Sequence, residues 1–428
     1  TMENLTEKEE QRERCFLVGI DTGEYDADAS IEELRELADT AGADVVGTAM
    51  QRREAPDKAT CIGRGRLEEI AALCENDAVD LVIVDRELSA TQQRNLEDLL
   101  PCRVIDRTML ILDIFAGRAH TAEGRLQVEL AQLQYMLPRL AGQGTALSRL
   151  GGGIGTRGPG ESKLESDRRH IRRRIDSLRA GLRRIEGRRL ESRKRRQKDE
   201  VRTVAIVGYT NAGKSTLLNR LTDAGVLAED KLFATLDTTA RGLQLPDGRT
   251  VLLVDTVGLI RRLPHHLVQA FHATLEEAAT ADLVLNLCDA SSSDAAEHLA
   301  ITESLLADLG RGDLPVLQVF NKCDRLTAKD DALLPPRTAD SGERLYISAK
   351  TGAGIDELLA AIAAALPRDR ERVTVLLPFS AGALAETCRR EGAVECEEYV
   401  PEGLRMTVTV DKRLLHKLKE SGATFFEA

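Results

Sequence analysis

The chain has 428 residues, of which 42% are hydrophobic and only 3% aromatic, and its formal net charge is −11 at pH 7. This length predicts two to four domains. No apolar run approaches the ~18 residues that a membrane-spanning helix needs, and no basic segment followed by an apolar one opens the sequence. These features exclude a membrane-embedded class, and we expect a cytoplasmic protein.

The eight cysteines form no Cys-x-x-Cys pair, and several fall within predicted core strands or helices. This distribution favours buried free thiols in a reducing compartment over zinc sites or disulfides. The seven histidines are scattered along the chain, so we assign none of them to a metal site.

The first predicted domain, residues 1–117, alternates short apolar runs with helical stretches. This βαβ pattern predicts a small parallel sheet. The glycine-rich segment 61–66 lacks a dinucleotide fingerprint, so we interpret it as a turn and keep a second ligand site as the alternative. The expected strands cover 16–20, 45–46, 81–84 and 103–105, and the expected helices lie near 30–40, 66–75 and 89–98.

The sequence pattern of residues 118–200 predicts two long helices that form an antiparallel hairpin. Leucine and isoleucine recur at steps of three and four, which indicates a heptad seam. Each helix could reach ~40–50 Å at 1.5 Å per residue. The expected tip, residues 142–160, includes five residues (151–155) of which four are glycine, so it cannot bury a core of its own. The seam residues are Leu126, Leu130, Leu133, Leu137, Leu140, Leu164, Ile171, Ile175, Leu178, Leu182 and Ile185.

The second of these helices is strongly basic, although the chain as a whole is acidic. Residues 161–200 contain 16 Lys and Arg against 8 Asp and Glu. A solvated charged face is the ordinary explanation, but a concentrated arginine strip on an acidic protein indicates contact with a phosphate backbone. The scarcity of aromatic residues favours structured RNA over single strands. The candidate RNA-binding residues are Arg157, Arg168, Arg169, Arg172 and Arg173.

Residues 208–215, Gly-Tyr-Thr-Asn-Ala-Gly-Lys-Ser, separate a predicted strand (203–207) from a predicted helix (215–221). The two glycines let the backbone curl so that its N–H groups point at a phosphate chain, next to the positive end of the helix. Lys214 is expected to reach the β- and γ-phosphates, and the Ser215 hydroxyl to bind Mg²⁺. The candidate phosphate-binding residues are Gly208, Tyr209, Thr210, Asn211, Ala212, Gly213, Lys214, Ser215 and Thr216.

The motif Asp255-Thr-Val-Gly258 follows an apolar run typical of a central parallel strand. Asp255 is placed to hold Mg²⁺ through water, and the N–H of Gly258 to sense a γ-phosphate. A nucleotide-closing threonine is also needed upstream, and spacing alone does not choose among Thr235, Thr238 and Thr239. The candidates in these two segments are Phe233, Ala234, Thr235, Leu236, Asp237, Asp255, Thr256, Val257 and Gly258.

Two further motifs predict guanine as the base. A carboxylate such as that of Asp324 can accept hydrogen bonds from both N1–H and the exocyclic amine of guanine, a donor pair that adenine lacks. A polar site left unpaired by the wrong base discriminates by ~10⁴-fold or more. The sequence therefore predicts a site for GTP and GDP. The candidate base-binding residues are Asn321, Lys322, Asp324, Ser348, Ala349 and Lys350.

Leu259 and Ile260 follow the second motif, where many small GTPases place a water-orienting glutamine. We therefore expect slow intrinsic hydrolysis that needs help from a partner, a rearranged loop or a monovalent cation. Asn211 occupies the position of the cation-binding asparagine of potassium-stimulated GTPases, so K⁺ is one hypothesis. The alternative is that Asn211 only braces the loop. The predicted GTPase domain spans 201–368, and a small α+β domain follows at 369–428.

Several segments together closely resemble the HflX GTPases, and the resemblance covers essentially the whole chain. They lie at 87–96, 104–115, 118–133, 151–161 and 233–237, and the glycine-rich block 151–161 is the most specific of them. The resemblance favours Thr235 as the switch threonine and second Mg²⁺ ligand, so the candidate catalytic residues are Lys214, Thr235 and Gly258. One departure is Thr238-Thr-Ala240, where many members have proline first and threonine last.

The resemblance implies a fold of an α/β domain, a helical hairpin, a P-loop GTPase domain and a small α+β domain. It also implies a translation-associated GTPase that binds ribosomal RNA of the large subunit and splits stalled or idle ribosomes. Basal hydrolysis would be low and stimulated by the ribosome, and some members also hydrolyse ATP. We expect a monomer. A rival hypothesis is an RNA-binding scaffold for which GTP is a regulatory ligand, and a third is an RNA-modification cofactor GTPase.

Overall fold

The computed structural model describes residues 12–148, 159–198, 201–222, 232–233, 239–262, 278–308, 314–326, 344–366 and 370–426. It divides into two compact units, Thr1–Ala363 and Ala364–Ala428. The mixed α/β fold class expected from the sequence is confirmed. No helix in these described ranges is both long enough and apolar enough to cross a membrane.

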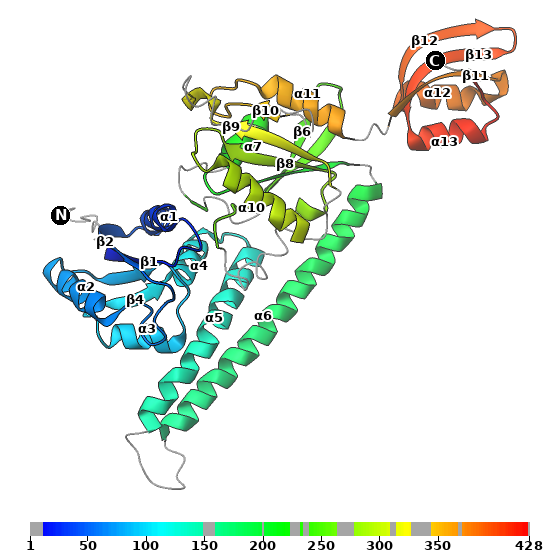
Figure 1. Ribbon diagram of the computed structural model, residues 1–428. Coiled ribbons are helices and arrows are strands. Elements are labelled where there is room, and N and C mark those ends of the chain that lie inside the picture. Colours follow the sequence, from blue (N-terminus) through cyan, green and yellow to red (C-terminus); the bar gives the residue numbers. More distant parts are fainter. Residues whose placement is uncertain are drawn as a thin grey trace, which may run out of the picture. The chain divides into compact units, whose positions relative to one another are not determined.

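The first unit begins with a four-stranded parallel sheet of order β2-β1-β3-β4 (Figure 1). Alternate residues of β1 enter two different cores. Cys15 and Leu17 pack with α1 and α4, whereas Phe16 and Val18 pack with α2 and α3, so helices cover both faces. The strands are β1 (Arg14–Asp21), β2 (Asp44–Arg52), β3 (Leu81–Val84) and β4 (Arg103–Asp106), and the helices are α1 (Ala27–Thr40), α2 (Arg64–Asn76), α3 (Ala90–Glu97) and α4 (Arg107–Arg118).

The strand order places a topological switch point between β1 and β3. The chain leaves β1 for β2 on one side and then crosses to β3 on the other. In open parallel sheets, ligands bind beyond the carboxyl ends of the strands at such a point. Here that position is bordered by Asp85, which directly follows β3, and by Ser30 of α1.

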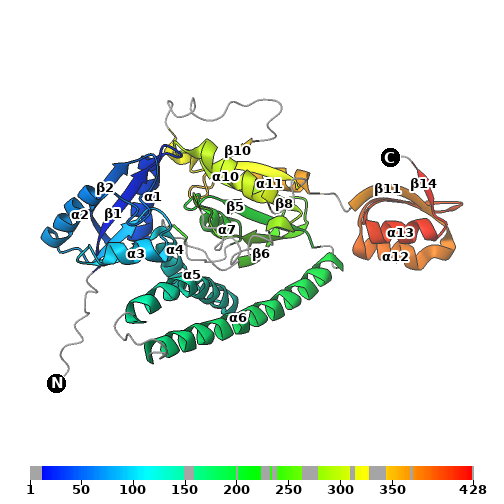
Figure 2. The same ribbon diagram turned by 60° about the horizontal axis from the view of Figure 1, so that its bottom comes forward.

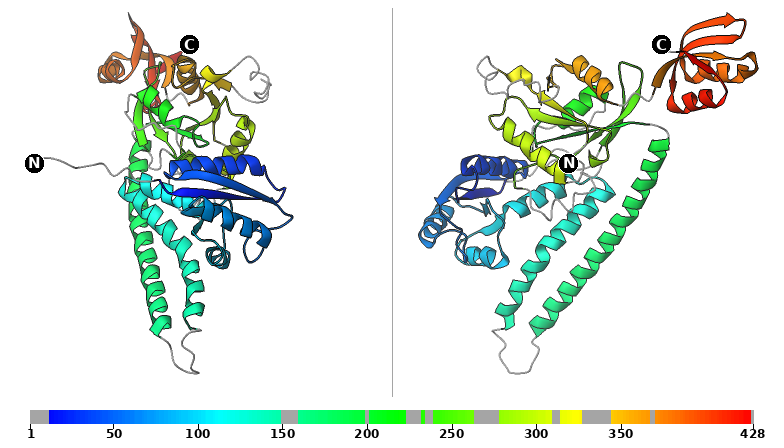
Figure 3. Two further views of the ribbon diagram at one scale, coloured as in Figure 1. Left: turned by 90° about the vertical axis from the view of Figure 1, so that its left-hand side faces the viewer. Right: turned by 45° about the vertical axis from the view of Figure 1, so that its right-hand side comes forward.

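Two long helices, α5 (Ala122–Ser148) and α6 (Pro159–Lys198), form the expected hairpin (Figure 3). The heptad seam is confirmed, because Leu130, Ile175 and Leu178 are buried against one another with other seam residues around them. The expected tip at 142–160 was too long, since α5 continues through residue 148. A single glycine in a helix costs only ~1 kcal/mol, which is too little to end a helix at Gly142 or Gly144.

The predicted GTPase domain is built on a six-stranded sheet of order β10-β9-β8-β5-β7-β6, in which only β6 runs antiparallel to its neighbour. Figure 2 labels β5, β6, β8 and β10 of this sheet. The predicted motifs follow the carboxyl ends of parallel strands, so they meet at one edge of the sheet. The elements are β5 (Thr203–Gly208), α7 (Lys214–Thr222), β6 (Thr239–Gln244), β7 (Thr250–Asp255), β8 (Leu283–Asp289), α10 (Ala295–Asp308), β9 (Val316–Asn321), β10 (Arg344–Tyr346) and α11 (Ile355–Ala365).

The second unit is a β-α-β-β-α-β module with an antiparallel sheet of order β12-β13-β11-β14. Val375, Met406 and Val408 point from the sheet into a core closed by the two helices. The small α+β domain expected from the sequence is confirmed, with its two helices alongside one antiparallel sheet. The elements are β11 (Arg370–Leu377), α12 (Gly382–Glu391), β12 (Ala393–Val400), β13 (Gly403–Asp411), α13 (Lys412–Glu420) and β14 (Thr424–Phe426).

Candidate nucleotide-binding site

The segment from Gly208 to Ser215 connects β5 to α7, as the sequence predicts. Gly213 has a φ of +93°, and a β-carbon added to it would come within 2.3 Å of the side-chain nitrogen of Asn321. Only glycine fits both the backbone conformation and this close approach. The loop is therefore held directly against the residue that begins the third motif.

Lys214 is buried at the start of α7, where its ammonium is held by two backbone carbonyls. Its Nζ donates to the oxygens of Gly208 at 3.0 Å and Tyr209 at 2.8 Å. Burial lowers the pKa of Lys214 to about 8, against the opposing effect of Asp255. An ammonium has three donors, so Lys214 can also donate a hydrogen bond to a phosphate oxygen.

The residues expected to bind magnesium lie together beneath the loop. Ser215 Oγ donates to Asp255 Oδ2 at 3.0 Å, and Asp255 is fully buried at the end of β7. A hydroxyl and a carboxylate are hard oxygen ligands, which suit Mg²⁺. Ser215 and Asp255 would therefore hold the ion, whose charge would neutralise phosphate oxygens. Thr235, the third expected ligand, lies outside the described residues, as do Ala234, Leu236 and Asp237.

The structure gives Asn321 a bracing position. Its Nδ2 donates to the oxygen of Ala212 at 2.8 Å, and its Oδ1 accepts the N–H of Ala349 at 2.9 Å. One side chain thus ties the phosphate loop to the loop that starts at Ser348. Most other sequence candidates lie in the phosphate loop, the loop after Asp255, the loop that starts at Ser348 or the first turn of α7: Ala212, Thr216, Thr256, Val257, Ser348, Ala349 and Lys350. Phe233 is instead buried against Phe115, with the ring centroids 4.6 Å apart.

Asp324 is exposed, as a base-reading carboxylate must be. Ser348 Oγ donates to Asp324 Oδ1 at 2.6 Å, and this hydrogen bond lowers the pKa of the Asp324 carboxyl. The group is therefore charged at neutral pH and its orientation is fixed. Lys322 packs alongside, with Nζ 2.8 Å from a carboxylate oxygen of Asp289.

Asn211 adopts a left-handed backbone conformation with a φ of +59°. Its Oδ1 accepts a hydrogen bond from Lys322 Nζ at 3.4 Å. This contact is what the bracing interpretation predicts, and it places an ammonium beside the oxygen that the potassium hypothesis would use.

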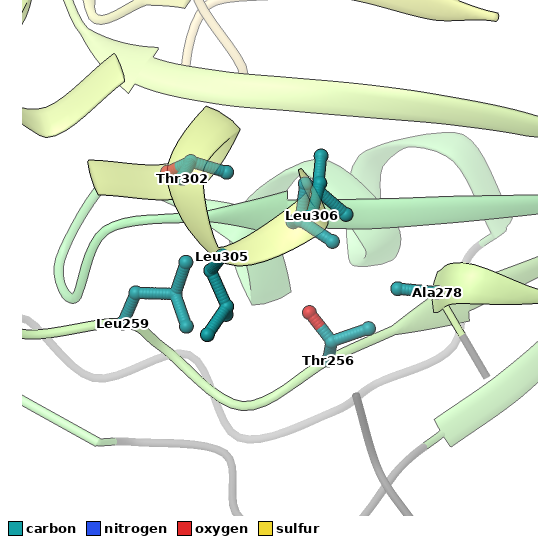
Figure 4. A pocket seen from close by; sticks show the side chains of 7 residues that line it. Thr256, Leu259, Ala278, Thr302, Leu305 and Leu306 are labelled. Carbon is teal, nitrogen blue, oxygen red and sulfur yellow. The ribbon is translucent and has the colours of Figure 1, made fainter. Parts of the chain in front are cut away.

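Leu259 turns away from the nucleotide loop into an apolar layer. Its side chain is 5% exposed and lines a cavity of about 10 Å³ with Thr256, Leu305 and Leu306 (Figure 4). Its backbone pairs with the loop, since Thr210 N–H donates to its oxygen at 2.7 Å and its own N–H donates to Gly208 at 3.1 Å. The position that often carries a catalytic glutamine therefore presents no polar side chain.

Sequence reasoning missed the part played by Tyr209. Its ring stacks on His298 at 3.7 Å, and its hydroxyl donates to Glu33 and accepts the N–H of Arg261 at 2.7 Å. Burial raises the pKa of Glu33, although Arg107 and Tyr209 both favour its charged form. Glu33 lies 176 positions earlier in the chain than Tyr209, so no local pattern signals this contact.

Four of the five RNA-binding candidates lie on α6. Arg169, Arg172 and Arg173 are exposed, Arg168 is half-buried, and Arg157 lies outside the described residues. Two other arginines of the basic strip pair with glutamates of the facing helix α5. Arg174 forms a bidentate pair with Glu129 at 2.6 and 2.7 Å, and Arg189 lies 2.9 Å from Glu123. These two arginines join the helices of the hairpin because the facing helix supplies glutamates.

Three family profiles match successive parts of the chain. They are described as "GTP-binding GTPase N-terminal" over residues 28–116, "GTP-binding GTPase Middle Region" over 118–196 and "50S ribosome-binding GTPase" over 203–322. GTPase HflX of Caldanaerobacter subterraneus subsp. tengcongensis is 49% identical over 97% of this chain and 95% of its own length. The chain belongs to the HflX family of GTPases. GTPase HflX of Escherichia coli is 42% identical over 91% of this chain and 93% of its own.

Among solved structures, the chain is similar to a GTP-binding protein from the archaeon Sulfolobus solfataricus in complex with GDP. The two are 24% identical, the match covers 82% of this chain and 98% of the other, and the TM-score is 0.44. Membership of the HflX family makes this chain a GTP-binding GTPase and confirms the resemblance seen in the sequence.

Proposed function

We propose that this HflX-family chain is a Mg²⁺-dependent GTPase that binds the large ribosomal subunit and splits stalled or idle ribosomes. One observation carries the proposal: the arginine-rich helix α6 is followed after four residues by β5, the strand that ends in the phosphate loop. A surface suited to RNA and the nucleotide site thus belong to one continuous stretch of chain. The cytoplasmic location and monomeric state expected from the sequence belong to this proposal.

Low intrinsic hydrolysis is the second part of the proposal. Leu259 is buried and apolar, so the protein's own second motif offers no side chain to orient the attacking water. We infer that a ribosomal contact reorders this segment and supplies the missing group. Hydrolysis would then follow docking and limit how long the protein stays bound.

Each site residue has a role in this scheme. Lys214 binds the β- and γ-phosphates, and Gly258 offers its N–H to the γ-phosphate. Ser215 and Asp255, with Thr235, hold Mg²⁺, which draws charge from the phosphate oxygens. Asp324 reads guanine, while Asn321 keeps the phosphate and base loops in register.

The exposed arginines Arg169, Arg172 and Arg173, with Arg168 and Arg157, form the proposed RNA surface. Guanidinium groups bind phosphates in a fixed fork, which suits a structured RNA backbone. A secondary ATPase activity through the N-terminal region receives less support. At the start of α2, the N–H of Gly63 donates to Gln51 at 2.7 Å, so this helix terminus uses that donor within the protein.

Sedimentation of whole ribosomes tests the function directly. With GTP or a non-hydrolysable analogue, the wild-type chain is expected to convert whole ribosomes into subunits, whereas GDP leaves them intact. Lys214→Ala serves as the control that cannot use nucleotide. Unchanged ribosome profiles with every nucleotide would overturn the proposal.

A GTPase assay with added large subunits separates the proposed enzyme from the rival scaffold. The proposal expects the subunits to raise the turnover rate strongly. If the protein cosediments with large subunits but its turnover stays at the basal rate, the scaffold hypothesis is correct and nucleotide is only a regulatory ligand.

A further inference from the structure

The side chain of Arg262, four residues after Gly258, enters the switch point of the N-terminal sheet. Its terminal nitrogen Nη2 lies 2.7 Å from Asp85 Oδ2, contacts Ser30 Oγ, and lies 3.3 Å from the backbone oxygen of Asp85. Its guanidinium carbon lies 4.0 Å from the centre of the Tyr25 ring. Asp85, Ser30 and Tyr25, which lie near the carboxyl ends of β1 and β3 and are called the crevice below, therefore surround a guanidinium group from the GTPase region.

The groups that line this crevice are buried and held in place. Asp85 is 2% exposed and Ser30 is 1% exposed. Ser30 Oγ donates to Asp85 Oδ2 at 2.6 Å, and Arg107 Nη1 donates to Asp85 Oδ1 at 2.8 Å. The Tyr25 hydroxyl donates to Ile20 at 2.9 Å, which fixes the ring. The crevice is a preorganised site, with an acceptor pair on one side and an aromatic face on the other.

The charges around the crevice favour a cation. Arg107 is shared between two buried carboxyl groups, those of Glu33 and Asp85. Arg262 gives Asp85 a second positive partner. Because an uncompensated buried carboxylate is costly, the site requires a positive group.

We propose that this crevice is a guanidinium-binding site whose ligand is Arg262, and that Arg262 is a positioning residue for the nucleotide site. The planar guanidinium stacks on Tyr25 while its edge faces the two oxygens, a combination that an ammonium cannot reproduce. The Arg262 side chain is 31% exposed, so the contact can open without unfolding the core.

When Arg262 occupies the crevice, it fixes the position of the segment 258–262. Arg262 has a φ of +50°, and the preceding Arg261 donates its N–H to Tyr209. At the other end of the segment, a β-carbon added to Gly258 would lie 3.2 Å from Lys214 Nζ. The held segment therefore lies against the ammonium that is expected to bind the γ-phosphate. Filling the crevice favours GDP over GTP, and emptying it releases the segment.

The test measures nucleotide affinity in Arg262→Ala by fluorescence titration. Affinity for a non-hydrolysable GTP analogue is expected to rise about fivefold, at the low end of the coupling between two sites, while GDP affinity stays unchanged. Added methylguanidinium refills the crevice and restores the wild-type ratio, whereas methylammonium at the same concentration does not. Arg262→Lys behaves like Arg262→Ala.

Arg52→Ala is the matched control. Arg52 belongs to the N-terminal domain that contains the crevice, and its side chain is 88% exposed. It is expected to leave the ratio of the two affinities at the wild-type value. Arg262→Gln provides a second variant if Arg262→Ala folds poorly, as judged by circular dichroism and thermal melting.

The proposal is overturned if the Arg262 variants keep the wild-type ratio of affinities. It is also overturned if methylguanidinium and methylammonium act alike. Neither result depends on ribosomes, so the outcome is independent of the proposed splitting activity.

Discussion

At the residue scale, the buried ammonium of Lys214 links nucleotide binding to pH. Its pKa is about 8 because burial penalises the charged form, whereas bound phosphates would favour that form. In the pH range in which Lys214 is partly neutral, nucleotide binding is therefore coupled to protonation of Lys214. We expect GDP affinity to be constant below pH 7 and to fall severalfold as pH rises from 7 to 8.8, measured by isothermal titration calorimetry.

The control for this prediction is Lys214→Ala, which should bind GDP weakly and without this pH dependence. A wild-type affinity that stays constant across the same range would show that Lys214 remains fully charged in the nucleotide-free protein.

In the proposed function, Asp324 selects the base through two hydrogen bonds to guanine. In Asp324→Asn, one acceptor becomes a donor, so guanine keeps one partner and faces a donor with its other N–H group, whereas xanthine, with a carbonyl in place of the exocyclic amine, matches the amide. We expect GTP affinity to fall ~10²-fold or more, since hydrogen bonds to charged groups contribute ~1.5–3 kcal/mol each. Competition between GTP and XTP measures the change. Asp356→Asn, at an exposed position in the first turn of α11, is the matched control. Unchanged GTP affinity would refute the base assignment.

Two roles of Asn211 can be distinguished by experiment: binding of a K⁺ ion that assists GTP hydrolysis, and bracing of the phosphate loop. If its side-chain oxygen binds K⁺, basal GTP hydrolysis will be faster in KCl than in NaCl, and Asn211→Ala will remove the difference. If it only braces the loop through Lys322, the wild-type rates in the two salts will be equal. Steady-state phosphate release at constant ionic strength measures both cases.

At the element scale, sequence periodicity predicts the helices and strands whose apolar residues recur on one face. The heptad seam of α5 and α6 and the four nucleotide motifs follow from short-range patterns, and the structure places them as expected. Helix α4 was missed because its buried residues lie on several sides, which hides the helical period. The cluster around Tyr209 and Arg262 was also missed, because its partners Glu33 and Asp85 come from a distant segment whose position only the tertiary fold determines.

The arginines of α6 give a prediction that separates RNA binding from nucleotide chemistry. We expect Gln substitutions at Arg168, Arg169, Arg172 and Arg173 to weaken binding to large subunits. The slope of log affinity against log salt concentration should become shallower by about 0.7–0.9 for each phosphate that is no longer neutralised. GTP affinity stays unchanged. The same substitution at Arg183 and Arg184, which are exposed farther along α6, is the control. Equal weakening in both sets would mean that only the total charge matters.

At the scale of the whole molecule, the segment between α5 and α6 can be replaced while both helices are kept. The helices end at Ser148 and begin at Pro159, so a short glycine–serine linker in place of 149–158 preserves both helices. We expect this variant to bind GTP normally and to fail to split ribosomes in sedimentation assays. Normal splitting would show that the segment has no part in the activity.

The length of α6 has a mechanical consequence. Its 40 residues span ~60 Å at 1.5 Å per residue, and its last turn lies four residues before β5. If α6 tilts together with α5, to which its seam residues pack, its far end moves farther than the end that leads to β5. A tilt of about 5° would sweep the far end through ~5 Å, about the rise of one helical turn. In the proposed function, a small rotation near the nucleotide would thus become a displacement comparable to the spacing of contacts on the ribosome.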